Sequence, residues 1–178
     1  MTPEREQREP DHISFEEVIS NATEIMLQDG QHVPVVIMDT NTNIFVGQIP
    51  NMPATHKERV ELMSFLGEAA GKSGRVDQLQ QVFMVSEGWL SIATENKQAE
   101  LRPSQDPERK EVLIVSNIQI QEHKKRLKVF EILRNNDEQV VGLQEIMPDK
   151  DPQDQTVDIP LLDAFVQGFQ MMFRIRFN

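Results

Sequence analysis

Apolar side chains recur every three or four positions over residues 15–26, and this spacing predicts an amphipathic helix. Ser14 and Glu17 have the spacing of a capping box at its start. Asp29 and Gly30 are typical of a helix end, because glycine readily adopts the left-handed conformation found there. The first ordered element is therefore expected to be a helix that buries one face.

A second helix is predicted where the same pattern returns after a proline-containing stretch. Thr55 and Glu58 form another capping box, and the apolar residues that follow lie on one face. Gly71 or Gly74 is the expected end of this helix.

Six further segments show the alternation or the short apolar run that is typical of β-strands. The first two are separated by turn-forming residues and are predicted to form a hairpin. In the third, Glu87 and Gly88 predict an interruption or a bulge. The predicted strands fall within residues 32–40, 44–50, 76–92, 110–121, 126–134 and 140–146.

The C-terminal segment has two overlapping patterns. Apolar residues from 162 to 172 recur at helical spacing, whereas apolar residues from 169 to 177 alternate as in a strand. We predict a helix to about residue 173 and leave the remainder open. Because apolar residues surround this helix, they are expected to be buried within the domain or against a second subunit. The candidate interface residues are Leu162, Phe165, Phe169, Met172 and Phe173.

The order of elements is helix, two strands, helix, three or four strands, helix. Consecutive strands can pair with their neighbours, and no regular alternation of strand and helix is present. The predicted fold class is therefore α+β, with a central antiparallel sheet of five to six strands covered by two to three helices. Residues 1–13 are predicted to form a flexible charged tail and residues 14–178 a single α+β domain. The element order is similar to that of the roadblock and profilin-like group of domains.

Charge and composition narrow the expected partners. The 178 residues include 18 Lys+Arg and 29 Asp+Glu, and the net charge of −11 repels nucleic acids and anionic lipids. The one dense basic cluster, at residues 123–128, is predicted to be a hairpin turn leading into a strand. The chain has no cysteine, no signal-peptide pattern and no run of about 18 apolar residues. We therefore expect a cytoplasmic protein that binds neither nucleic acid nor membrane.

The stretch MVSEGWLSI contains the candidate chemistry. Ser86 lacks the small-residue elbow of a hydrolase nucleophile, so no catalytic residue is assigned. One interpretation makes Trp89 a buried core ring and Glu87 a solvated bulge residue. The other places a cleft for a small anionic ligand here, with an arginine of the following loop either holding Glu87 or binding the ligand. The candidate cleft residues are Ser86, Glu87, Trp89, Arg102 and Arg109.

Metal and cofactor sites are not predicted. The four histidines, at positions 12, 32, 56 and 123, show no zinc-binding spacing. The sequence GKSG at residues 71–74 follows a helix, whereas a phosphate-binding loop precedes one.

The sequences VFMVSEGWLS and LRPSQDPERKEVLIV resemble a pattern found in a group of small uncharacterised bacterial and phage proteins, over about residues 32–135. This resemblance implies no established activity. The favoured hypothesis is a noncatalytic binding or assembly module that acts through protein-protein contacts, as a homodimer formed by the C-terminal segment or a sheet edge. The alternative is an enzyme of unrecognised type that uses Glu87, Arg109 and Trp89. The similarity to roadblock domains adds regulation of a small GTPase as a third hypothesis.

Overall fold

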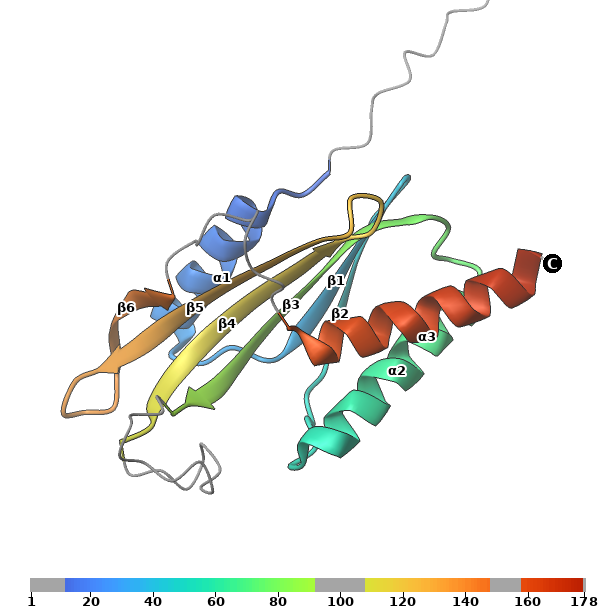
Figure 1. Ribbon diagram of the computed structural model, residues 1–178. Helices are drawn as coiled ribbons and strands as arrows, with labels where there is room; N and C mark the ends of the chain where they lie inside the picture. The colour runs from blue at the N-terminus through green and yellow to red at the C-terminus, as the bar shows by residue number, and fades with distance from the viewer. Residues whose placement is uncertain (1–11, 92–107, 148–157, 178) are drawn as a thin grey trace, which may run out of the picture.

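The computed structural model describes residues 12–91, 108–147 and 158–177 (Figure 1). Along this part of the chain the elements are α1 (Phe15–Asp29), β1 (Val35–Thr40), β2 (Ile44–Gln48), α2 (His56–Lys72), β3 (Leu79–Leu90), β4 (Lys110–Gln119), β5 (Lys124–Arg134), β6 (Val140–Met147) and α3 (Pro160–Phe177). The six strands form one antiparallel sheet in the spatial order β2-β1-β3-β4-β5-β6. Figure 1 shows α1 on one face of this sheet and α2 with α3 on the other. The predicted fold class is confirmed.

The ends of α1 follow the predicted signals. The N–H of Glu17 donates to Ser14 Oγ at 3.1 Å, and the Glu17 carboxylate accepts from the N–H of Ser14 at 2.7 Å. These hydrogen bonds, first from the main chain and then from the hydroxyl of Ser14, hold the pKa of Glu17 below its ordinary value. At the other end Gly30 has φ 71° and its N–H donates to the carbonyl oxygen of Met26 at 3.0 Å.

Alternation along the central strand β3 gives each face of the sheet its own core. Val82 and Met84 belong to the core beneath α2 and α3, whereas Phe83 and Val85 belong to the core beneath α1. The predicted apolar face of α1 contacts the second core, and the ring of Phe15 stacks on that of Phe83 with centroids 6.5 Å apart.

The helices α2 and α3 pack with their backbones in contact. An added Cβ at Gly67 would overlap the carbonyl oxygen of Phe165, and one at Gly168 would overlap that of Ser64. Glycine is therefore required on both helices, because any side chain would force them apart.

The C-terminal helix is longer than predicted. It continues to Phe177, so the strand-like alternation after residue 169 is the pattern of a helix that is apolar on most sides. Phe169 and Phe173 stack on each other toward the sheet, whereas Met171 and Ile175 are exposed.

The predicted interruption of β3 is wrong; of the basic cluster only His123 lies in the hairpin turn, and its lysines and Arg126 lie on β5, into which the turn leads. β3 pairs with β4 continuously from Gln81 to Leu90. An added Cβ at Gly88 would lie 3.3 Å from Ile114 Cδ1, so this glycine makes room for a neighbouring side chain within a regular strand. Residues 120–123 form the turn between β4 and β5.

Candidate functional site

The predicted cleft residues on β3 are divided between the two faces of the sheet. Met84 belongs to the core under α2 and α3, and Val85 to the core under α1. Since successive strand residues point to opposite faces, Ser86 points toward α2 and α3, whereas Glu87 and Trp89 point toward the α1 side. Ser86 therefore cannot act together with the other two.

The interpretation of Trp89 as a core ring is wrong, because its side chain is 47% exposed. α1 ends at Asp29, and His32 in the segment after it contacts Glu87 of β3. Trp89 lies two residues further along β3, beyond the end of the helix, so no described helix covers it. The guanidinium carbon of Arg109 lies 4.3 Å from the centroid of the indole ring, in cation-π geometry. Arg102 lies outside the described residues.

Two carboxylates fasten the connection between α1 and β1 to the sheet. Glu87 is partly buried and accepts a hydrogen bond from the main-chain N–H of His32, which corrects the interpretation of Glu87 as a solvated bulge residue. Arg134 donates from Nε and Nη2 to Glu111 at 2.7 Å each, and from Nη2 to the carbonyl oxygen of Gly30 at 3.2 Å. The hydrogen bonds with Glu111 raise the pKa of Arg134 above its ordinary value, although partial burial opposes this. Both carboxylates thus have positioning roles.

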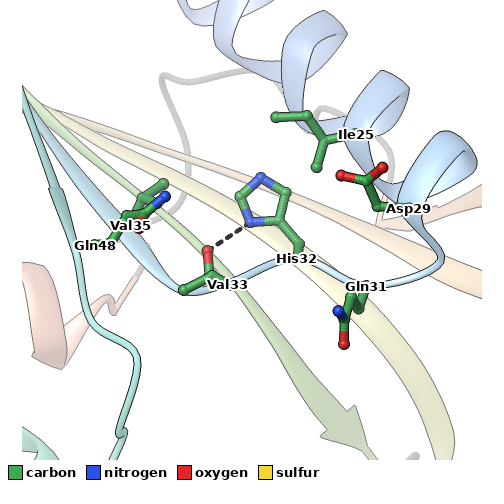
Figure 2. A pocket seen from close by; sticks show the side chains of 7 residues that line it. All are labelled: Ile25, Asp29, Gln31, His32, Val33, Val35 and Gln48. Atoms are coloured by element: carbon green, nitrogen blue, oxygen red, sulfur yellow. Dashed lines mark hydrogen bonds between the residues drawn. The ribbon is translucent and has the colours of Figure 1, made fainter.

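A hollow of about 530 Å³ opens between the end of α1 and the first two strands. Figure 2 shows the ring of His32 between Ile25 and Asp29 of α1 and Val35 and Gln48 of the strands. His32 Nδ1 lies 2.8 Å from the carbonyl oxygen of Val33; because a carbonyl only accepts, Nδ1 carries the hydrogen. The predicted cleft residues that the structure describes, Ser86, Glu87, Trp89 and Arg109, do not line this hollow.

A buried carboxylate near the start of α1 was not predicted. Asp39 is 1% exposed; it accepts from His12 Nδ1 at 3.0 Å and from Gln81 Nε2 at 2.8 Å. The same Gln81 amide donates to the carbonyl oxygen of Ile13 at 2.7 Å. This cluster fastens residues 12 and 13 to the sheet and satisfies the carboxylate. The burial of Asp39 has one sign in the sequence: Asp39 lies two positions after Ile37, so both side chains point to the same face of the strand, toward the apolar core.

The predicted C-terminal interface lies mostly inside the chain. Leu162, Phe165 and Phe169 are buried in the core between α2, α3 and the sheet, and Phe173 packs against that core. Met172 is half-buried, and its Cβ would lie 3.1 Å from a Cβ added at Gly71. These residues hold the two helices together, so Leu162, Phe165 and Phe169 are not available to a second folded subunit.

One half of the sheet face that carries α1 has no helix over it within the described residues. α1 contacts β4 and β6, and Figure 1 shows it over that side of the sheet. On the opposite face, β1 and β2 contribute Val36 and Phe45 to the core under α2 and α3. On the α1 side, Val35 and Ile37 of β1 are half-buried against the edge of the core under α1, and Asp39 is buried beneath residues 12 and 13. Strand β1 is therefore partly covered on that side, and β2 has no described helix over it there.

Apolar side chains occupy the uncovered half. Ile37 of β1 pairs with Val46 of β2, whose side chain is 64% exposed. We call this surface the bare face; it consists of the exposed Val33, Ile44 and Val46 and of the half-buried Val35 and Ile37, which also border the core under α1. Ile25 of α1 is exposed beside it, across the hollow. An exposed apolar surface of this kind is typical of an interaction site.

Among the described residues, no group of three or more His, Cys, Asp or Glu side chains could hold a metal ion. No helix in this part of the chain is long and apolar enough to cross a membrane.

Comparison with curated proteins and with solved structures finds no match for this chain, so its similarity to roadblock and profilin-like domains stays a prediction. A family profile does match, over residues 1–167, and its description is "Bacteriophage lambda protein ea47". This match covers nearly the whole chain and agrees with the resemblance to small phage proteins. The chain belongs to the family of bacteriophage lambda protein ea47.

Proposed function

We propose that this chain is a noncatalytic assembly module that forms a homodimer through the outer edge of β2. The observation that carries the proposal is the chemistry of that edge. β2 is the last strand on its side of the described sheet. Edge strands are usually protected from pairing by charges, lysines or prolines, and β2 contains none of these.

The main chain of β2 offers hydrogen-bonding groups to a partner. Asn43 and Ile49, at either end of the strand, turn their main-chain groups toward the β1 side: Thr40 N–H donates to Asn43 O, and Ile49 N–H donates to Pro34 O. Because strand residues alternate, Ile44, Val46 and Gln48 turn their N–H and carbonyl groups outward. Three residues with outward groups are enough for a short antiparallel ladder.

A second copy of β2 fits this edge by symmetry. Antiparallel pairing centred on Val46 places Ile44 of one copy opposite Gln48 of the other, and the same contact is repeated about a two-fold axis. The two sheets then join into one.

Charge distribution supports a second copy as the partner at this edge. Although 26% of the chain is charged, residues 40–55 contain no Asp, Glu, Lys or Arg. Two molecules that each carry a net charge of −11 can therefore meet here without bringing carboxylates into contact. The opposite edge differs, because β6 includes Glu145, which pairs with Lys128 at 2.6 Å.

The test is the oligomeric state of Val46→Lys, measured by size-exclusion chromatography with light scattering at about 10–100 μM chain. Wild type is expected to be dimeric. The variant is expected to weaken the dimer at least about tenfold, because two lysines then lie opposite each other at the two-fold axis. The matched control is Val141→Lys on the β6 edge, where the side chain is 61% exposed against 64% for Val46.

The outcomes separate clearly. A monomeric wild type over this concentration range contradicts the proposal, and so does a dimer that Val46→Lys leaves intact. A dimer lost equally in Val141→Lys would show that the effect is not specific to β2 and would also count against the β2 edge.

A further inference from the structure

We infer that the bare face is a docking site for an amphipathic helix of a partner protein, with lysine or arginine residues flanking the apolar stripe of that helix. This inference concerns the face of the sheet beside α1. The proposed dimer uses the main-chain edge of β2. Because Val46 belongs to both surfaces, the inference is tested at Glu24, Ile25 and Asp29 of α1, which lie outside that edge.

The dimensions of the sheet leave room for one more helix. Strands lie about 4.8 Å apart and a helix with its side chains is about 10 Å wide, so one helix covers roughly two or three strands. The six-stranded sheet carries two helices on one face and only α1 on the other, among the described residues. The space lies over β2 and the half-covered β1, and the hollow lined by Ile25, Val35 and Gln48 separates it from α1.

The surface of this space is suited to an apolar helix stripe. Its floor is formed by the branched side chains of Ile37, Ile44 and Val46, and one side by Ile25 of α1. The hollow beside His32 adds depth at one end, where a larger side chain of the partner can insert.

The surrounding charge identifies the partner as basic. Residues 9–56 contain no lysine or arginine, yet this span supplies all of α1, β1 and β2. The helix α1 contains four carboxylates: Glu16 pairs with Arg126 of β5, Glu17 accepts from Ser14 in the capping box, Glu24 lies one position before Ile25, and Asp29 lines the hollow. An apolar floor beside carboxylates complements an apolar stripe beside lysine or arginine. A second copy of this chain would bring another acidic α1 to the same place, and anionic lipids would be repelled.

The probe is a fluorescein-labelled peptide of about 14 residues, roughly four helical turns, made of leucine at 3-4 spacing with lysine elsewhere. Fluorescence anisotropy with the full chain is expected to show one peptide per chain. A peptide of the same spacing with glutamate in place of lysine is expected to bind at least about tenfold more weakly.

Substitutions locate the site. Glu24→Lys with Asp29→Lys is expected to weaken binding of the lysine peptide at least about tenfold, and Ile25→Gln several-fold. The matched control is Glu61→Lys with Glu68→Lys, which changes the net charge equally on α2, on the opposite face of the sheet. This control is expected to change binding by no more than about two- to threefold.

The following results would overturn the inference. If the glutamate peptide binds as tightly as the lysine peptide, charge does not select the partner. If the control variant weakens binding of the lysine peptide as much as the α1 variant does, the peptide is attracted to the acidic protein as a whole and not to the bare face. Neither result bears on the dimer, which is measured without peptide, and the α1 substitutions lie outside the β2 edge, so the two proposals fail separately.

Discussion

Arg134 donates two hydrogen bonds to Glu111 and another to the carbonyl oxygen of Gly30, the residue that caps α1. Both charged side chains are 22% exposed, so the pair is shielded from water more than an ordinary surface ion pair. The contact joins the end of the first helix to β4 and β5, which are distant in sequence. Its role is therefore to position α1 on the sheet, next to the bare face.

Glu111→Gln tests this role, because it keeps the shape of the side chain and removes its charge. We expect a loss of about 1–3 kcal/mol in the free energy of unfolding, since a bidentate, partly buried pair becomes a neutral contact. The measurement is urea denaturation followed by circular dichroism. The control is Glu61→Gln, whose pair with Lys57 is 3.8 Å long and exposed; it is expected to cost less than about 0.5 kcal/mol. Equal losses in both variants would contradict a special role for Glu111.

Local signals at single residues were predictable, whereas burial was not. The capping boxes at Ser14 and Thr55 form as their spacing predicts, because all their atoms lie within one helical turn. The exposure of Trp89 depends on where α1 ends relative to β3, which is a tertiary property. The contact between Asp39 and His12 likewise joins residues 27 positions apart; the strand pattern indicates on which face Asp39 lies but does not identify its partner.

At the scale of elements, the pair α2 and α3 depends on glycine. Gly67 and Gly168 allow a backbone contact that any side chain would prevent. In a single sequence, a glycine that ends a helix and a glycine that contacts another helix look alike. The glycines near the end of the second helix therefore predict where that helix ends but not that it packs closely on α3. The strand-like alternation after residue 169 was ambiguous for a related reason: apolar residues on most sides of a helix satisfy both periods.

Gly67→Ala tests the backbone contact. In an isolated helix this change is stabilising by about 1 kcal/mol, so a net loss would report the clash with Phe165. We expect a net loss of about 1–3 kcal/mol, measured by thermal and urea unfolding. Gly142→Ala is the control, because its added Cβ would lie 3.7 Å from Leu133 Cδ1, an ordinary contact distance. If Gly67→Ala is as stable as the control, the helices are free to move apart and the packing argument is wrong.

At the scale of the molecule, the fold class followed from the order and period of the apolar segments, which reflect burial directly. The bare face could not be predicted in the same way. The apolar run of β1 is typical of a strand covered on both faces, and β1 is indeed half-covered on the α1 side, whereas its neighbour β2 has no described helix over that face. Which strands a helix covers depends on the path of the segment that connects the helix to the sheet. The pattern of apolar residues within a helix or a strand does not specify that path.

Salt should act in opposite directions on the two proposed contacts. Dimerisation brings together two bodies of net charge −11 through an uncharged strip, so screening reduces their repulsion. Docking of the lysine peptide brings opposite charges together, so screening weakens it. Raising NaCl from about 20 mM to about 500 mM, which shortens the Debye length about fivefold, is therefore expected to tighten the dimer severalfold and weaken peptide binding about tenfold or more. Analytical ultracentrifugation and anisotropy measure the two constants on the same sample. A dimer that weakens with salt would show that charged residues pair across it, which the uncharged edge of β2 cannot provide.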